Sequence, residues 1–251
     1  MASESCISKR LIAKKTFRVY IFDTMSSPSP LLYDTYYHIY NRGNNRENIF
    51  IQERNYTHFM NLYAKYIEPI ADTFAFCLLR NHFHVSLRTK SKEEIFPNEE
   101  ETLKVFLAGR QTRLAILDES QGKKPLGSFV DQYLSRQFSN FFNAYSKAIN
   151  TAYGRTGSLF QHPFGRVPIT SEGQFWNVIA YIHQNPQKHG FVKDFRDWKW
   201  SSYRVMLSDK PTKLKRAAVL DWFGGEQSYL KLHEKWVAEA DSKWFAEDDC
   251  D

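Results

Sequence analysis

The chain has few cysteines and no long apolar run. Only three of its 251 residues are cysteine, and Cys6, Cys77 and Cys250 form no CxxC pair. This usage excludes a zinc finger of ordinary spacing and is typical of a reduced, intracellular protein. No apolar stretch approaches the roughly 18 residues that a membrane-spanning helix needs. We therefore expect no membrane association.

The N-terminus also lacks the pattern of a secretion signal. Its basic residues are not followed by an apolar stretch and a small-residue cleavage site. We therefore expect a cytoplasmic protein. Residues 1–30 are interpreted as a flexible extension, because they show no periodicity and end in the Ser/Pro segment MSSPSP. Met25 is a candidate for the natural start of the chain.

Aromatic and basic residues are plentiful. The hydrophobic fraction of 42% and the aromatic fraction of 16% suffice for a packed core and exclude wholesale disorder. Residues 131–220 carry 13 Lys and Arg against 5 Asp and Glu, whereas residues 221–251 carry 3 against 9. A basic, aromatic-rich middle suits a polyanion whose bases stack on aromatic rings, although a solvated basic face has the same composition.

The apolar periodicity predicts alternating strands and helices. Strands are expected over 34–41, 73–79 and 82–87, with a further short strand at the end of the loop 153–169. Helices are expected over 53–69, 102–118 and 128–152, and from Ser171 to a point before Pro186. This order favours an α+β fold, with an antiparallel sheet covered by helices, over a doubly wound parallel sheet.

We divide the chain into three parts. Residues 31–205 are expected to form the main domain, with an insertion at about 90–127. The N-terminal extension, residues 1–30, precedes this domain. Residues 206–251 follow it as an acidic helical extension.

The segment LLRNHFHVSLRTK places two histidines one residue apart on a predicted strand. Because side chains alternate across a strand, His82 and His84 project from one face, while Phe83 and Val85 project from the other. Two imidazoles on one face suit the binding of a single divalent ion. Taken alone, the pattern is more typical of two histidines on a solvated sheet face.

A second pattern, SEGQFWNVIAYIHQNPQKHG, lies about 100 residues downstream. Ser171 and Gln174 match a capping box, which predicts a helix start. On this helix Tyr181 lies at the flank of the apolar stripe, and Asn185 follows one turn later on the same side. Pro186 is expected to place Asn185 at or just past the last turn. The pair suits a nucleophile and a metal ligand, or else a core tyrosine and a capping asparagine.

Taken together, these segments resemble the REP-associated tyrosine transposases, which are relatives of the IS200-like transposases. NHFHV is similar to the His-hydrophobe-His motif of the HUH single-strand endonucleases, and YIHQNPQKHGF is similar to the family's tyrosine motif. The blocks FNAYSKAINTAYGRTGSLFQHPFGR and WKWSSY also resemble this family. The resemblance covers about residues 34–205 and implies a ferredoxin-like α+β domain with a central antiparallel sheet.

The resemblance assigns roles to four residues. It makes His82 and His84 the metal-binding pair, Asn185 the third metal ligand and Tyr181 the catalytic nucleophile. The implied reaction is cleavage and rejoining of hairpin-bearing single-stranded DNA through a 5′-phosphotyrosine intermediate. The implied cofactor is a divalent ion, Mg²⁺ or Mn²⁺. We expect the protein to act as a monomer or homodimer.

Five basic residues are candidates for contact with the DNA backbone. Arg42 and Arg46 belong to the segment NRGNNREN, and Arg155 and Arg166 belong to a loop punctuated by glycine. Lys188 follows the tyrosine motif. Glycine-rich basic loops can approach phosphates closely, but ordinary basic turns have the same composition.

Other interpretations remain open at this point. His162, His183 and His189 are interpreted as ordinary surface residues rather than extra ligands. A catalytically silent, domesticated nucleic-acid-binding protein on the same fold is the main alternative, and an RNA-binding module with base-stacking aromatics is a third. The presence of Tyr181 and Asn185 together with both motif histidines favours the enzyme, because a pure binder does not require that combination.

Overall fold

The computed structural model describes residues 31–97 and 126–238. The expected helix over 102–118 lies outside the described residues, as do the two terminal segments 1–30 and 239–251. Within the described part, no helix is both long enough and apolar enough to cross a membrane.

Apart from the short helices η1, α2 and η2, the described elements follow the order β1–α1–β2–β3–α4–β4, with α5 to α8 after them. The strands are β1 (Tyr36–Arg42), β2 (Ala71–Leu78), β3 (His82–Thr89) and β4 (Gly165–Pro168). The α-helices are α1 (Glu53–Tyr66), α2 (Lys92–Ile95), α4 (Leu126–Tyr153), α5 (Glu172–Lys188), α6 (Tyr203–Met206), α7 (Arg216–Trp222) and α8 (Glu226–Ala238). Two 3₁₀ helices are η1 (Asn44–Arg46) and η2 (Phe195–Asp197).

The strands form one antiparallel sheet in the order β2-β3-β1-β4. Each of the units β1–α1–β2 and β3–α4–β4 joins two parallel strands that are separated by one strand of the other unit. This is the split β-α-β arrangement of the ferredoxin-like fold. The predicted α+β fold with an antiparallel sheet is confirmed.

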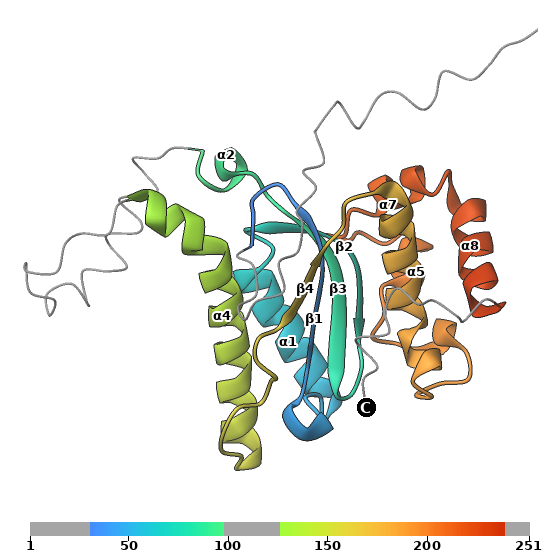
Figure 1. Ribbon diagram of the computed structural model, residues 1–251. Helices are drawn as coiled ribbons and strands as arrows, with labels where there is room; N and C mark the ends of the chain where they lie inside the picture. Colours follow the sequence, from blue (N-terminus) through green and yellow to red (C-terminus); the bar gives the residue numbers. More distant parts are fainter. Residues whose placement is uncertain (1–30, 98–125, 239–251) are drawn as a thin grey trace, which may run out of the picture.

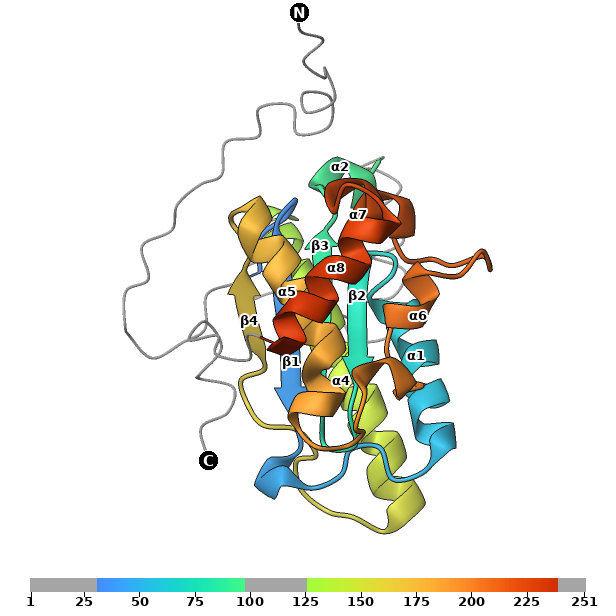
Figure 2. The ribbon, with the colours of Figure 1, turned by 90° about the vertical axis from the view of Figure 1, so that its right-hand side faces the viewer.

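Helices cover both faces of the sheet. Figure 1 shows α1 and α4 on one face and α5 on the other, with α8 outside α5. Figure 2 views the molecule from the α5 side. Strand residues that face α1 and α4 are apolar and buried, among them Ile39, Phe83 and Val85. The alternate residues of the same strands, including His82 and His84, therefore face α5.

Helix α5 is buried on more than one side, which explains its continuous run of apolar residues. Ser171 caps its first turn by accepting a hydrogen bond from the Gln174 backbone N–H. Gln174 completes no reciprocal box, because its side chain accepts from Thr170 instead. The prediction that the helix stops before Pro186 is wrong. Pro186 lies in the last turn and is buried there, so the missing N–H costs only one helical hydrogen bond.

The outer side of α5 packs against the C-terminal helix α8. His183 of α5 bonds through Nδ1 to His233 Nε2 of α8 at 2.9 Å, and through Nε2 to the Ser202 hydroxyl at 2.7 Å. The ring of Tyr229 is also fully buried there. The interpretation of His183 as a surface residue is therefore wrong. Helical periodicity shows that it lies off the apolar stripe, but not that a second layer covers it.

On the edge strand β4, a glycine lies against a tyrosine ring of β1. Gly165 pairs with Tyr40 in the sheet register. A Cβ added at Gly165 would lie 2.2 Å from two atoms of the Tyr40 ring. The absence of a side chain at Gly165 therefore lets the ring lie flat across the edge strand.

We predict that Gly165→Ala lowers the free energy of unfolding by about 1–3 kcal/mol, because the Tyr40 ring must move aside. In a Tyr40→Ala background the same change should cost little, which gives a positive coupling in a double-mutant cycle. Gly173→Ala is the matched control: a Cβ there meets no atom within 4 Å. Thermal or urea unfolding measures all variants. If Gly165→Ala lowers the free energy of unfolding equally in both backgrounds, the Tyr40 ring is not the cause of the loss.

A second prediction concerns pH. Burial lowers the pKa of His233 from 6.5 to about 4. The unfolded chain therefore takes up this proton at a higher pH than the folded chain. His233 should remove up to about 3 kcal/mol of stability as the pH falls from 6.5 to about 4, and no more below that.

Unfolding of His233→Gln, followed at several pH values across this window, tests the assignment. The variant should have a flatter pH profile than the wild type, even though it loses the bond to His183. Exposed His162 offers a control, since His162→Gln should keep the wild-type slope. An unchanged slope in His233→Gln would refute a protonation-linked role for this histidine.

Candidate functional site

Polar side chains from β1, β3 and α5 meet on the α5 face of the sheet. In the strand register Tyr40 lies opposite His84, which places His38, two residues earlier, on the same face. From above, α5 contributes Tyr181 and Asn185, which are one helical turn apart. His38, His84 and Asn185 are all at most 2% exposed. The structure thus brings together the four site residues proposed from sequence.

His82 presents one ring nitrogen to the site. Its Nδ1 lies 2.7 Å from the Asn81 side-chain oxygen, which can only accept, so the proton is assigned to Nδ1. The Nε2 atom then carries a lone pair, and within the described residues it is buried without a hydrogen-bond partner. Burial, with help from His189 and Arg42, lowers the pKa of His82 to about 3. The ring is therefore neutral near pH 7.

His84 repeats this pattern with a different partner. Its Nδ1 lies 3.0 Å from His38 Nε2, and the two rings stack. The His84 Nε2 atom is buried and has no hydrogen-bond partner among the described residues. Burial holds the pKa of His84 well below its usual value and lowers that of His38 to about 3. Sequence reasoning missed His38, although a histidine central to the expected strand 34–41 was the available signal.

Asn185 supplies a third acceptor. Its Nδ2 donates to the Tyr181 backbone carbonyl at 2.9 Å, which assigns Oδ1 to the opposite side of the amide. This Oδ1 atom is buried and, in the described part of the chain, has no hydrogen-bond partner. Asn185 is close enough to His82 to raise the pKa of that ring slightly against the stronger effect of burial. With His82 protonated at Nδ1, its Nε2 atom and Asn185 Oδ1 are both acceptors, and neither can donate a hydrogen bond to the other.

Such a cluster of acceptors fits a divalent ion. Leaving buried acceptors without partners is costly, and a cation satisfies all three at once. The ring centres of His82 and His84 are 5.1 Å apart and nearly perpendicular. Two imidazoles that bind one ion through bonds of about 2 Å have ring centres about 5 Å apart. No group of three or more His, Cys, Asp or Glu suited to a metal occurs among the described residues, so an ion bound here would take Asn185 as its third protein ligand.

Tyr181 lies directly beside these groups. Its ring centre is 5.5 Å from that of His84 and 5.9 Å from that of His38, both in edge-to-face geometry. The Nζ of Lys188 lies over the ring, 5.1 Å from its centre. Tyr181 is only 3% exposed. The tyrosine therefore belongs to the same site as the histidines of its own chain, and it lies under a positive charge.

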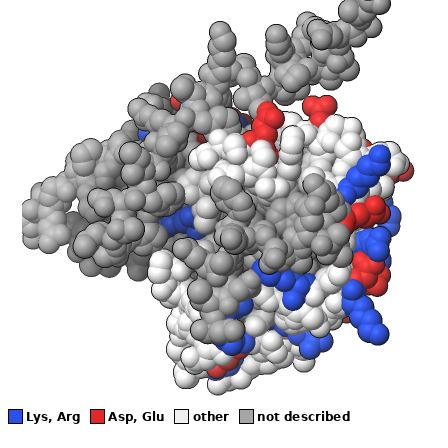
Figure 3. Space-filling view, turned by 45° about the vertical axis from the view of Figure 1, so that its right-hand side comes forward, with Lys and Arg blue, Asp and Glu red and all other residues white. Residues whose placement is uncertain are grey.

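The other basic candidates are distributed unevenly. Arg42 ends β1 directly opposite His82, and Arg46 is exposed in the short helix η1 that follows. Figure 3 shows Lys and Arg side chains in the lower part of that view, where the loop after β1 and the C-terminal end of α5 lie. Arg42 and Lys188 therefore border the site at one end of the sheet, and Arg46 lies in the segment that follows Arg42.

Arg155 and Arg166 have different surroundings. Arg155 forms an ion pair with Glu47, which belongs to the segment after β1. Arg166 pairs with Ile39 in the register and so projects to the opposite face, where it lies over the Phe164 ring. Burial lowers its pKa below the usual range. The structure does not bring Arg166 to the histidine site.

Two further histidines flank the motif residues in sequence. His189 follows α5, and its ring centre lies 4.7 Å from that of His82. The interpretation of His189 as an ordinary surface residue is thus wrong, because the end of the helix folds it back onto β3. His162 is exposed, as expected.

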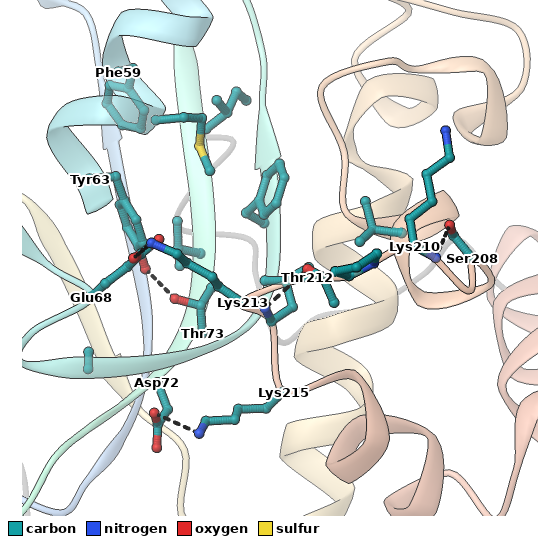
Figure 4. A pocket seen from close by; sticks show the side chains of 18 of the residues that line it. Phe59, Tyr63, Glu68, Asp72, Thr73, Ser208, Lys210, Thr212, Lys213 and Lys215 are labelled. Atoms are coloured by element: carbon teal, nitrogen blue, oxygen red, sulfur yellow. Dashed lines mark hydrogen bonds and ion pairs between the residues drawn. The ribbon is translucent and has the colours of Figure 1, made fainter. Parts of the chain in front are cut away.

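A cavity of about 880 Å³ lies away from this site, at the β2 edge of the sheet. Its walls include Phe59 and the segment that precedes α7. Two of the lysines that line it are paired with acidic residues, Lys213 with Glu68 and Lys215 with Asp72 (Figure 4). These two ion pairs lower the positive charge that the cavity offers to a polyanion.

Comparisons with known proteins point to the group that the sequence motifs resemble. No protein-family model matches the chain. A curated REP-associated tyrosine transposase of Haemophilus influenzae is 23% identical over 132 residues. The match covers 53% of this chain, and the chain spans 58% of the length of that relative. A solved structure of a REP-associated tyrosine transposase bound to a REP hairpin has a TM-score of 0.48 and 15% identity, covering 75% of this chain and 89% of that one.

The histidine, tyrosine and asparagine motifs were the basis for the resemblance seen in the sequence. The four-stranded sheet brings those motifs together at one site. The resemblance to the REP-associated tyrosine transposases is confirmed by a curated relative of that name.

Proposed function

We propose that the chain is a metal-dependent tyrosine transposase that cleaves and rejoins hairpin-bearing single-stranded DNA. The observation that carries the proposal is the convergence of three buried acceptors beside Tyr181. Within the described residues His82 Nε2, His84 Nε2 and Asn185 Oδ1 have no hydrogen-bond partners. A structural role alone gives no reason to bury three such atoms together.

The residues around the proposed ion have two roles: some would bind it, and others orient the histidines. His82, His84 and Asn185 would hold Mg²⁺ or Mn²⁺, and the bound ion would polarise a non-bridging phosphate oxygen. Asn81 and His38 act behind the two histidines. The Asn81 side-chain oxygen accepts a hydrogen bond from His82 Nδ1–H, and His38 Nε2 would accept one from His84 Nδ1–H. These two bonds would fix the tautomers that present Nε2 to the ion.

Tyr181 carries the covalent chemistry. Its phenolic oxygen attacks phosphorus, the bond to the 3′-oxygen breaks, and a 5′-phosphotyrosine forms. The phenolic proton ends on the released 3′-oxygen, either directly or through solvent. Attack by a second 3′-hydroxyl reverses the step and rejoins the strand without ATP. The ordinary pKa of tyrosine, about 10, leaves the phenol neutral near pH 7. A nearby positive charge favours the phenolate, and the Lys188 ammonium over the Tyr181 ring supplies one.

Two features support a site that is complete within one chain. Tyr181 contacts the His84 ring of its own chain, so no tyrosine from a second subunit is needed. Arg42 and Lys188 border the site on two sides and can neutralise a phosphate that approaches the end of the sheet.

One observation favours the alternative of a catalytically silent DNA-binding protein. Tyr181 is 3% exposed, so a DNA phosphate reaches its hydroxyl only after neighbouring groups move. Lys188, in the last turn of α5, is exposed and covers one face of the ring, so it is one of the groups that can move without disturbing the core. Detection of a covalent adduct separates the two functions.

We predict that the wild type forms a covalent adduct with a hairpin-bearing single strand in the presence of Mn²⁺, whereas Tyr181→Phe forms none. Removal of the phenolic oxygen removes the nucleophile and leaves the ring contacts. The adduct is measured as a labelled band that resists denaturing electrophoresis. Tyr66→Phe, on α1 at the other face, should keep wild-type yield. If the wild type binds the strand without forming an adduct, the silent DNA-binding function is correct.

Metal binding gives a separate prediction. Mn²⁺ at about 100 times its dissociation constant should raise the free energy of unfolding by about 2.7 kcal/mol, which is a shift of a few degrees. His82→Ala and Asn185→Ala should each abolish most of this shift, because each removes one ligand. The exposed variant His162→Ala should retain it. A shift that survives in both ligand variants would place the ion elsewhere.

A further inference from the structure

A column of parallel aromatic rings lies at the end of the sheet near His82. The Phe50 and Tyr56 rings stack with centres 4.3 Å apart and planes 12° apart. Trp200 stacks on the other side of Tyr56, at 4.6 Å and 10°. Phe50 and Tyr56 are buried, whereas Trp200 is half-buried. The column therefore ends in an indole ring at the surface.

Trp200 borders a cleft of about 550 Å³. We call it the aromatic cleft, and its walls include Phe50, Ile51, Tyr56, Arg80, Trp198 and Trp200. Ile51 is 43% exposed. The column and Ile51 thus line an open apolar recess. Core packing accounts for the inner two rings, but not for the exposed Ile51 side chain beside the half-buried indole.

The rim of the aromatic cleft is basic. Lys199 Nζ lies over the Trp200 ring, 5.3 Å from its centre. Because Tyr56 covers one face of this indole, the ammonium lies over the other. Lys199 is 70% exposed and forms an ion pair with Glu53. Exposed side chains of this kind are displaced easily, so a flat ring can replace the lysine while the ammonium moves to a phosphate.

Hydrogen bonds connect the cleft to the histidine site. The Arg80 carbonyl accepts from the Phe50 backbone N–H, and Asn81, the next residue, bonds to His82. On the other wall, Trp198 donates to the Leu78 carbonyl at the end of β2. The cleft and the candidate metal ligand are therefore held by the same β2–β3 turn.

We propose that the aromatic cleft holds one unpaired base of the DNA strand that crosses the histidine site. The base stacks on Trp200, and Arg80 and Lys199 take the adjoining phosphates. Stacking on an exposed aromatic ring is the usual way in which proteins hold single-stranded bases. The inference rests on the proposed function, for which it names a subsite. It makes a base at a fixed position in the single-stranded flank a determinant of recognition.

The test is an abasic scan. The probe is a DNA stem-loop with oligothymidylate flanks on both sides, in which each flank nucleotide is replaced in turn by an abasic residue. Binding is measured without added metal, so that no cleavage is required. One position should weaken wild-type binding roughly five-fold or more. Trp200→Leu should bind the intact probe as weakly as the wild type binds that abasic probe, and the abasic penalty should disappear in the variant.

Controls separate this inference from folding and from the proposed function. Trp176→Leu changes another half-buried indole, which lies near Phe223 of the C-terminal part, and should keep the wild-type profile. If Trp200→Leu does not fold, 2-aminopurine scanned through the flanks of the wild-type probe replaces it, and one position should be quenched on binding. A profile with no sensitive position, or a penalty unchanged in Trp200→Leu, overturns the inference. A missing Tyr181 adduct alone leaves the inference standing.

Discussion

The site depends on the hydrogen bonds made by the Nδ1 atoms of His82 and His84. Asn81 bonds to the Nδ1 atom of His82 and His38 bonds to that of His84, and within the described residues both Nε2 atoms are buried without a hydrogen-bond partner. Asn185 adds its carbonyl oxygen to them. Burial keeps His82 and His84 neutral, which is the form that binds metal. The geometry of the site therefore follows from hydrogen bonds one layer behind the proposed ligands.

Helix α5 is the element that completes this arrangement. One side carries Tyr181 and Asn185 to the sheet, and another carries His183 to the C-terminal helix α8. The acidic C-terminal extension thus contributes, through α8, to the packing that holds the proposed nucleophile in place. Rigid placement of this kind suits a reaction in which the attacking oxygen must line up with a phosphodiester.

Much of the fold follows from local patterns. Alternating and continuous apolar runs located the strands, and Ser171 located the start of α5 at its true cap. The strand pattern around His82 and His84 also predicted that both side chains lie on one face of the sheet, because alternate residues of a strand point to the same side. The end of α5 was predicted less well. Pro186 is tolerated there since packing outweighs the local preference against a proline in a helix.

Sequence alone determined which residues carry the proposed chemistry: two histidines on one strand face, and a tyrosine and an asparagine one turn apart. Tertiary structure decided what surrounds them. The strand order β2-β3-β1-β4 brings His38 against His84, and the register sends Arg166 to the opposite face. The packing of α8 buries His183. These contacts join segments far apart in the chain, so no local periodicity encodes them.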